Sequence, residues 1–399
     1  MNLCFITHES SKTHELNKIP SGVITILLQL CEKWPDYDKI IVLTNKRHWA
    51  YPVIREKFKK RKNIIVKPFP WILVSEFREI VDRPLFQHLF FKIVFRTTQL
   101  LLIPFYIIRL TIWLLNNKVD GVLNHNGGWP AGELNRWVAI AAKIAAIKNN
   151  ILVIHNTPSS TSKFFNIIEH IRDRFIYWCC KEIITVSQSC RKSLIVGTNL
   201  GSGIKVIYNG INISPTQQRK KIPLKKDTIS VGFVGEVNHR KGVHVLFESL
   251  KYVHTPCEVI IIGNGDKNYI EKLKDLQTDI PWPITFLGYR EDVIDLYEGL
   301  DIVVLPSIAF ESFGLVLIEA MICEKPVICS DFGGMKEVVD HEQTGLIVPA
   351  NNAKTLALAL DQLLSNVALR CKMGKAGRKR VVELFSDKKM IRQYQRLFH

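Results

Sequence analysis

Short apolar runs alternate with amphipathic stretches along the whole chain, and this alternation predicts strands separated by helices. Helices are expected at Val23–Cys31 and Ala131–Ile147. Strands joined through helices imply a parallel, doubly wound sheet, in which ligands gather at the carboxyl ends of the strands. The expected strands of the first half are Leu3–Thr7, Lys39–Thr44, Asn63–Val66, Val119–Asn124, Ile151–His155, Glu182–Val186 and Lys205–Ile207.

A polar, basic stretch with two prolines, Asn212–Lys226, interrupts this pattern and is typical of a linker between domains. After it the alternation resumes, with a helix expected from Arg240 to Leu250 and another at Phe313–Cys323. The sequence therefore predicts two α/β domains. The expected strands of the second half are Ile229–Gly235, Glu258–Gly263, Ile284–Gly288, Asp301–Leu305 and residues 326–330.

The composition limits the number of domains, the type of binding partner and the cellular compartment that the chain is expected to have. The 399 residues suffice for two domains with full cores, and the formal net charge of +17 favours nucleic acid, anionic membrane or phosphorylated ligands as partners. No helix-turn-helix, RNA-recognition or zinc-finger signature is present, which argues against nucleic acid. Nine cysteines without a C-x-x-C pair favour a reducing compartment, and the N-terminus has the pattern of a buried strand rather than a signal peptide. We therefore expect a cytoplasmic protein.

Two glutamates eight positions apart, Glu311 and Glu319, stand out in the second half. Glu311 lies in the loop after a predicted strand, and Glu319 lies about two turns into the helix that follows. The first amides of that helix, from Phe313, Gly314 and Leu315, are suited to a diphosphate, because they lack partners and carry partial positive charge. The carboxylates would repel phosphate and should face sugar hydroxyls instead. A capped core helix with two solvated glutamates is the alternative.

The surrounding motifs favour the ligand site. Glu311 and Glu319 form an E-x7-E pattern, residues 311–314 form E-x-F-G, and residues 333–337 form G-G-x-x-E. In this order and spacing the chain closely resembles the donor-binding half of retaining glycosyltransferases of family 4, which have the GT-B fold. The resemblance covers most of the second domain and extends loosely over the first.

The resemblance implies two Rossmann-like domains facing a cleft. Residues 1–212 would form the acceptor domain and residues 213–385 the donor domain, with residues 386–399 forming a helix that packs back on the first domain. A nucleotide-diphosphate-sugar would be the donor substrate, no cofactor or metal would be needed, and the sugar would be transferred with retention of configuration. Glu319 would hold the ribose diol, and Glu311 would bind sugar hydroxyls and position the donor.

Other donor-side residues follow from the same resemblance. Gly235, Lys241 and Gly242 match the family's G-R-x4-K-G pattern, whereas Glu236 replaces its arginine. Arg240 is the candidate to supply the missing positive charge beside the diphosphate, together with Lys241. Tyr289 follows the strand whose end holds the nucleobase in relatives. A solvated Arg-Lys pair is the alternative interpretation of residues 240 and 241.

Three features of the first domain are acceptor-side candidates. Ser21 and Gly22 stand where the family has a Gly-Gly loop, although a plain turn with an N-cap serine explains them nearly as well. His125 matches a histidine that lies near the reaction centre in relatives, so the resemblance makes it a catalytic candidate, with Glu311 and Lys241, that would contact the sugar near the anomeric carbon. His155, after the next predicted strand, is a further candidate, with a structural role equally open.

The stretch from Leu85 to Trp113 is unusually apolar, with recurring basic residues, and its longest uncharged run is too short to cross a membrane. It predicts either an interfacial segment on an anionic membrane or a pair of core helices. In the first case the protein is peripheral on the cytoplasmic face and its acceptor is carbohydrate or lipid-linked, such as a polysaccharide or lipopolysaccharide precursor.

Two other functions stay open at this point. One is another GT-B enzyme, such as a phosphorylase; the other is a non-catalytic membrane or polysaccharide-assembly protein that keeps the fold. A D-x-D sequence at residues 36–38 lies far from the donor half and predicts a turn rather than a metal site.

Overall fold

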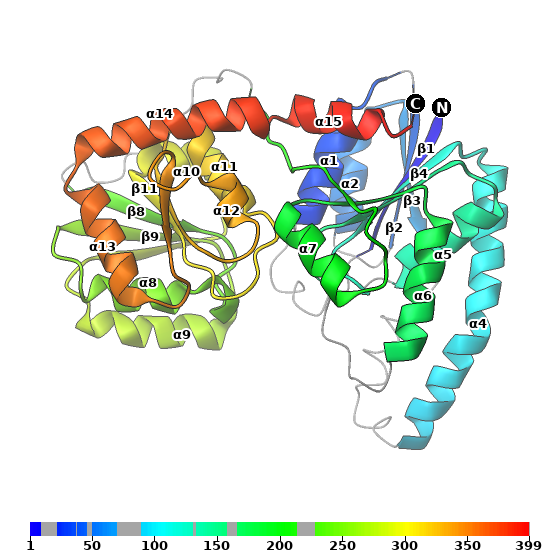
Figure 1. Ribbon diagram of the computed structural model, residues 1–399, viewed down its shortest axis with the longest axis horizontal. Helices are drawn as coiled ribbons and strands as arrows, with labels where there is room; N and C mark the ends of the chain where they lie inside the picture. Colours follow the sequence, from blue (N-terminus) through cyan, green and yellow to red (C-terminus); the bar gives the residue numbers. More distant parts are fainter. Residues whose placement is uncertain are drawn as a thin grey trace. The chain divides into compact units, whose positions relative to one another are not determined.

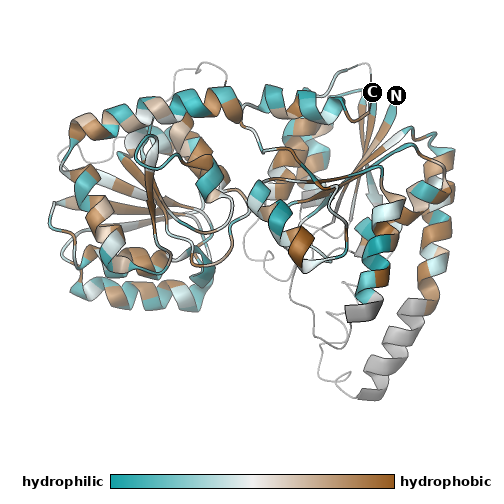
Figure 2. Ribbon diagram, in the orientation of Figure 1, coloured by the Kyte–Doolittle hydropathy of each residue, from teal (hydrophilic) through white to brown (hydrophobic). Residues whose placement is uncertain are grey.

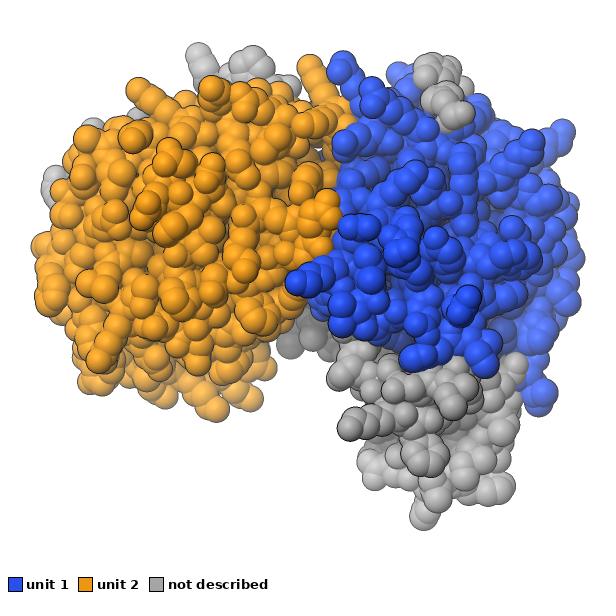
Figure 3. Space-filling model, viewed as in Figure 1, with its two compact units in different colours: residues 1–186, 190–207, 391–399 blue, residues 187–189, 208–390 orange. Residues whose placement is uncertain are grey.

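The computed structural model describes residues 1–8, 22–36, 38–45, 50–69, 89–130, 133–157, 166–213 and 228–398. These residues form two compact units, coloured separately in Figure 3. Unit 1 comprises Met1–Val186, Cys190–Ile207 and Ile391–His399, and unit 2 comprises Ser187–Ser189 and Tyr208–Met390. The long segment of unit 2 begins at Tyr208. The sequence predicted this domain boundary a few residues later, after residue 212.

Unit 1 is built on a seven-stranded parallel sheet in the order β3-β2-β1-β4-β5-β6-β7 (Figure 1). Its strands are β1 (Asn2–His8), β2 (Lys39–Asn45), β3 (Ile64–Phe69), β4 (Gly121–Asn126), β5 (Asn149–Ile154), β6 (Glu182–Thr185) and β7 (Lys205–Val206). Its helices are α1 (Gly22–Lys33), α2 (Ala50–Phe58), α4 (Leu89–Asn116), α5 (Glu133–Ile144), α6 (Asn166–Cys179) and, from Cys190 on, α7 (Gln188–Gly197).

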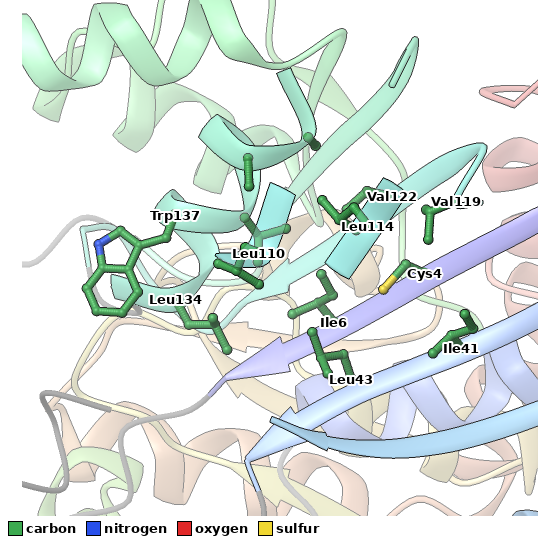
Figure 4. Close-up of a cluster of buried hydrophobic side chains, with 13 residues drawn as sticks. Cys4, Ile6, Ile41, Leu43, Leu110, Leu114, Val119, Val122, Leu134 and Trp137 are labelled. Carbon is green, nitrogen blue, oxygen red and sulfur yellow. The ribbon is translucent and has the colours of Figure 1, made fainter. Parts of the chain in front are cut away.

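One buried cluster of unit 1 lies between this sheet and helices α4 and α5. Cys4 and Ile6 of β1 and Val122 of β4 pack against Leu110 and Leu114 of α4 (Figure 4). Burying such aliphatic side chains contributes roughly 1.5–3 kcal/mol each. The inner face of α4 is therefore part of the core, as one of the two interpretations of the apolar segment predicted, although within residues 89–116 it is one helix rather than two.

Unit 2 has a six-stranded parallel sheet in the order β10-β9-β8-β11-β12-β13. Its strands are β8 (Ile229–Val234), β9 (Cys257–Ile262), β10 (Ile284–Gly288), β11 (Ile302–Leu305), β12 (Val327–Ser330) and β13 (Gly345–Val348). Its helices are η3 (His239–Lys241), α8 (Val243–Leu250), α9 (Lys267–Leu276), η4 (Gln277–Asp279), α10 (Val293–Gly299), α11 (Leu315–Ile322), α12 (Met335–Val338), α13 (Ala353–Leu364) and α14 (Val367–Leu384).

Both sheets are apolar in their central strands, which Figure 2 shows in brown. β4 and β11 are buried along their whole length, because helices cover both faces of a doubly wound sheet. The two doubly wound parallel sheets confirm the predicted fold class. No helix among the described residues combines the length and the apolar character needed to span a bilayer.

The last helix, α15 (Asp387–Gln395), leads the chain into unit 1. Phe398 packs edge-on against Trp34 at 5.7 Å between ring centroids, and its carbonyl accepts a hydrogen bond from the Asn149 side chain. Gly121 has no room for a side chain, because a Cβ there would lie 2.6 Å from the Phe398 ring. These contacts join the C-terminus to the sheet of unit 1.

The basic residues of α14 have structural partners that the sequence did not indicate. Arg370 donates to the carbonyls of Leu363 and Leu364 at the end of α13. Arg378 donates to Ile322 O at the end of α11. Cations at helix C-termini satisfy carbonyls that lack intrahelical partners and complement the helix dipole. Arg370 and Arg378 therefore hold helices of unit 2 together.

Candidate active site

The candidate site of unit 2 begins where the loops after β8 and β9 touch. Gly235 has a φ of 143°, and a Cβ on Gly263 would lie 1.8 Å from the Gly235 carbonyl oxygen. Only glycine permits so close an approach of two backbones. The Val237 amide also donates to Asn264 O at 2.9 Å. The glycines of these two loops are thus required by the fold itself, in addition to the ligand contact that the resemblance implied for Gly235.

Lys241 ends a short 3₁₀ turn that follows this loop. The Asn238 side chain accepts a hydrogen bond from the Lys241 amide, and Gly242, with a φ of 69°, ends the turn. A Cβ on Gly242 would lie 2.0 Å from Pro306 O, and Ile308 N donates to Arg240 O. The continuous helix predicted from Arg240 to Leu250 is therefore wrong, because Gly242 breaks it so that the turn can pack on the loop after β11.

This packing joins the predicted cations to the first glutamate of the E-x7-E pattern. Lys241 Nζ lies 2.5 Å from Glu311 Oε2, and an Arg240 guanidinium nitrogen lies 3.4 Å from the same oxygen. The side chains of Lys241 and Glu311 are only 13% and 16% exposed, whereas that of Arg240 is 42% exposed. Burial alone would raise the pKa of Glu311, but the charges and hydrogen bonds of Lys241 and Arg240 lower it. Glu311 is thus a carboxylate at neutral pH.

The Gly333–Gly334 turn fixes the backbone beside Glu311. Gly334 N donates to Glu311 O at 2.8 Å. Gly333 has a φ of 71°, and a Cβ there would lie 2.2 Å from the same carbonyl oxygen. A Cβ on Gly334 would lie 2.2 Å from Ser312 O. Both glycines of the G-G-x-x-E motif are therefore needed for the chain to pass this close to the Glu311 loop.

Helix α11 begins at Leu315, two residues later than the sequence predicted. Gly314, with a φ of 88°, precedes it and provides no side-chain cap for its first amides. Phe313 is 2% exposed, and its ring packs edge-on against Phe385 at 5.5 Å. The start of the helix is thus anchored by an aromatic side chain, and its N-cap residue, Gly314, has no side chain that could accept a hydrogen bond from the first amides.

Glu319 lies in the second turn of α11 and is held by a tyrosine that sequence reasoning missed. The Tyr297 hydroxyl, from α10, donates to Glu319 Oε2 at 3.2 Å and to Val316 O at 3.3 Å. Burial raises the pKa of Glu319, and the hydrogen bond from Tyr297 offsets part of that rise. Nothing in the sequence links these residues, which are separated by 22 positions. The hydrogen bond from Tyr297 engages one of the two carboxylate oxygens of Glu319.

The glutamate of the G-G-x-x-E motif, Glu337, has a different partner set. Its carboxylate accepts hydrogen bonds from the amides of Gln188 and Ser189, both at 2.7 Å, and from the Tyr208 hydroxyl at 3.1 Å. Gln188 and Ser189 are the first residues of α7, so Glu337 caps that helix. Burial, followed by the Glu337 charge, raises the pKa of Tyr208 to about 12. The geometry gives Glu337 a structural role.

Tyr289 lies at the end of β10 and is 36% exposed. Its amide donates to the Asn264 side chain at 3.1 Å, which fixes the backbone at the place where the resemblance puts the nucleobase. Glu236 is half-buried, and its carbonyl accepts a hydrogen bond from Asn238 N. The loops after β8, β9 and β10 therefore share direct hydrogen bonds.

The first-domain candidates His125 and His155 are in contact. His125 Nδ1 lies 2.8 Å from His155 Nε2, and the two rings stack. His125 is fully buried and His155 is 7% exposed. Burial, with the neighbouring His155, lowers the pKa of His125, and burial lowers that of His155 to about 4. Both imidazoles are therefore neutral at physiological pH.

The environment of this pair is polar. The Asn135 side chain donates to His125 O at 2.8 Å, and the Tyr394 ring lies 6.3 Å from the His125 ring. Among the described residues no partner reaches His125 Nε2. Of the two predicted loop residues, Gly22 is the exposed first residue of α1, and Ser21 lies outside the described residues.

Comparisons with known proteins agree with these features. Residues 215–380 match a family model described as glycosyl transferases group 1. An uncharacterised glycosyltransferase of Methanocaldococcus jannaschii, MJ1607, is 31% identical over 57% of this chain and 61% of the relative. The capsular polysaccharide biosynthesis glycosyltransferase CapM of Staphylococcus aureus is 26% identical over 72% of this chain and 78% of the relative. The match to the first of these relatives thus spans about three fifths of its length.

The comparison of structures concerns the whole chain. The crystal structure of HepE from Anabaena in complex with UDP superposes with a TM-score of 0.74 and 19% identity, over 99% of both chains. At 19% identity this similarity is evidence for a shared fold only. The chain therefore has the GT-B fold, and its residues 215–380, all of them in unit 2, match the glycosyl transferases of group 1.

Proposed function

We propose that this protein is a glycosyltransferase that moves a sugar from a nucleotide-diphosphate-sugar donor to a carbohydrate or lipid-linked acceptor. The observation that carries the proposal is the cluster of Lys241, Arg240 and Glu311, which two loops of unit 2 bring together within the group 1 match. Two cations beside a carboxylate, next to a helix N-terminus without a side-chain cap, suit a charged diphosphate joined to a neutral sugar.

In this proposal unit 2 binds the donor. Glu319 accepts hydrogen bonds from the ribose diol through the carboxylate oxygen that Tyr297 leaves available. Tyr289 lies beside the nucleobase. Solved neighbours with the same fold were crystallised with UDP and with UDP-glucose, so UDP-sugars are the first donors to test.

The chemistry follows from where charge develops. As the bond between the sugar and the diphosphate breaks, negative charge builds on the leaving group. Lys241 and Arg240 supply preorganised positive charge there, and the Phe313–Leu315 amides add to it, so a metal ion is not required. Glu311 binds sugar hydroxyls and holds the donor in place. The departing diphosphate takes the proton of the attacking acceptor hydroxyl on the same face of the sugar, which retains the anomeric configuration.

Unit 1 holds the acceptor in this proposal. His125 and His155 lie at the carboxyl ends of β4 and β5, where ligands of doubly wound sheets gather. Gly22 begins α1, and with Ser21 it belongs to the predicted acceptor loop. CapM, one of the relatives, is named for capsular polysaccharide biosynthesis, which favours a precursor of a cell-surface polysaccharide as the acceptor class.

A thermal-shift screen against nucleotide sugars tests the proposal, followed by measurement of nucleoside diphosphate release with the best donor. A ligand at a hundred times its dissociation constant stabilises the folded protein by about 2.7 kcal/mol. At least one donor should raise the melting temperature and release its nucleoside diphosphate when acceptor is added. If no nucleotide sugar binds, the proposal fails, and a non-catalytic protein that keeps the GT-B fold becomes the better account.

A further inference from the structure

Helix α4 is apolar on both of its faces. Its inner face, with Leu110 and Leu114, belongs to the core of unit 1. Its outer face carries large apolar side chains at helical spacing that point to solvent. We call these the α4 stripe: Leu101 (78% exposed), Phe105 (49%), Ile108 (57%), Ile112 (51%) and Leu115 (55%).

The core does not account for this stripe. A helix that packs one face on a sheet is expected to be polar on the other, and a helix that is apolar all round is normally buried or in contact with lipid. Contiguous exposed apolar surface of this kind marks an interaction site in a folded protein. Leu102 and Pro104, also exposed, widen the stripe near its N-terminal end. The outer face of α4 therefore needs a partner.

A second exposed stripe lies on α6, which like α4 packs against α5. Ile171, Phe175 and Trp178 are 66%, 45% and 61% exposed and follow one another at helical spacing. The rings of Phe175 and Trp178 stack at 5.8 Å. Two helices flanking α5 thus both present large apolar and aromatic side chains to solvent.

The charge around the α4 stripe is positive. Residues 83–119 contain five Lys or Arg residues and no Asp or Glu. Arg109 lies over the Phe105 ring at 5.4 Å, and Lys143 lies over the Trp178 ring at 4.3 Å. Of the nearby carboxylates, Glu169 pairs with Arg172, and Asp120 accepts a hydrogen bond from Asn2 N. Basic residues beside an apolar face are the arrangement that binds anionic lipid headgroups and acyl chains together.

We infer that the outer face of α4, with the adjoining stripe of α6, docks unit 1 on the surface of an anionic lipid bilayer. The stripe side chains enter the headgroup region, and Arg109, Lys118 and Lys143 contact lipid phosphates. Their long side chains can carry the charge to the headgroups while their methylenes follow the apolar surface. The inference does not depend on glycosyl transfer, because the residues that carry it belong to unit 1 and the proposed donor site belongs to unit 2.

Co-sedimentation of the full chain with vesicles tests the inference. The vesicles are made of phosphatidylcholine with or without phosphatidylglycerol. Wild-type protein should sediment with the anionic vesicles, and binding should weaken steeply as salt rises. The double variant Ile108→Ser with Ile112→Ser should lower the partition coefficient about ten- to a hundred-fold, because it removes two apolar side chains from the contact.

A matched control comes from unit 2. Leu358→Ser with Val367→Ser replaces two apolar side chains that are 71% and 63% exposed on α13 and α14, and it should bind vesicles like the wild type. Melting temperature and UDP affinity are measured for all three proteins, so that loss of vesicle binding can be separated from unfolding and from any failure of the proposed donor site.

Three outcomes would overturn the inference. One is equal recovery of wild type in the supernatant with and without anionic vesicles. Another is vesicle binding that the stripe variant leaves unchanged. The third is concentration-dependent dimerisation that the stripe variant abolishes, without vesicle binding, which would mean that a second copy of the chain covers α4.

Discussion

Replacing Lys241 by alanine should lower both the unfolding free energy and the rate of sugar transfer, and the two effects can be separated. Lys241 Nζ lies 2.5 Å from Glu311 Oε2, with both side chains largely buried. In Lys241→Ala the carboxylate keeps only Arg240, at 3.4 Å and largely exposed. Leaving a buried charge without its main partner costs about 3 kcal/mol, near the lower end of the range for buried pairs because Arg240 stays.

The sign of the pH dependence follows from the lowered pKa of Glu311. The folded protein binds this proton less tightly than the unfolded chain does. The pair therefore stabilises the fold above the ordinary glutamate pKa, and the stabilisation is lost as pH falls through the lowered value. The difference in unfolding free energy between wild type and Lys241→Ala, measured by urea denaturation, should shrink in acid.

The double variant Lys241→Ala with Glu311→Gln separates stability from chemistry. Removing the unpaired carboxylate should restore most of the lost unfolding free energy. A buried ion pair that loses one partner leaves an uncompensated charge, whereas a pair that loses both partners does not. Turnover should not recover, because the charge at the leaving group is still missing and Glu311, which holds the donor, is also replaced; the expected loss in Lys241→Ala is about a hundred- to a thousand-fold. Arg240→Ala should lose less. A Lys241→Ala enzyme with wild-type turnover and UDP affinity would refute the assignment of Lys241.

Three other predictions test neighbouring parts of the account. Glu319→Ala should weaken UDP binding about ten- to a hundred-fold in calorimetric titration, because a hydrogen bond to a charged acceptor is lost; unchanged affinity would place Glu319 outside the site. Gly333→Ala should lower the urea unfolding free energy by about 1–3 kcal/mol, since its Cβ would lie 2.2 Å from Glu311 O at a φ of 71°, whereas Gly128→Ala, with ordinary contacts, should be tolerated. Burial lowers the pKa of His155 to about 4, so protonating this imidazole should cost the wild type up to about 3 kcal/mol of unfolding free energy as pH falls from 6.5 to 4; His155→Asn should lessen the acid loss, to which His125 also contributes, and an unchanged pH profile would contradict a buried neutral imidazole.

The sequence predicted the repeating parts of the fold well, because buried strands such as β1, β4 and β8 show up as apolar runs bounded by turn residues. Element starts were less predictable. Gly242 and Gly314 both have a positive φ and directly precede α8 and α11. The Pro306 carbonyl packs against Gly242, and the side chains of Leu317 and Met335 pack against Gly314. Both helices therefore begin later than the periodicity indicated. Long-range packing sets such boundaries, and a local pattern does not record it.

In the candidate site, too, the sequence identified residues that belong to motifs but not the contacts between distant segments. Glu311 and Lys241 were recognisable from their motifs, but the ion pair between them depends on the contact of Gly242 with Pro306 O. No local signal marks Tyr297, and although Glu337 stands in the G-G-x-x-E motif, its structural role comes from partners far away in the sequence. Within its described residues the apolar segment forms one helix whose inner face belongs to the core and whose outer face is also apolar. Periodicity does not distinguish a helix with one core face from a helix with two apolar faces.

The central claim is that unit 2 binds a nucleoside diphosphate through its own cations and the helix α11 N-terminus. Calorimetric titration of the purified chain with UDP and with GDP in excess EDTA tests it most directly, because it needs no acceptor. The account predicts that one of the two nucleotides binds with a stoichiometry of about one per chain, and that Lys241→Ala weakens this binding about ten- to a hundred-fold. Absence of binding in EDTA, with binding restored by manganese, would contradict it.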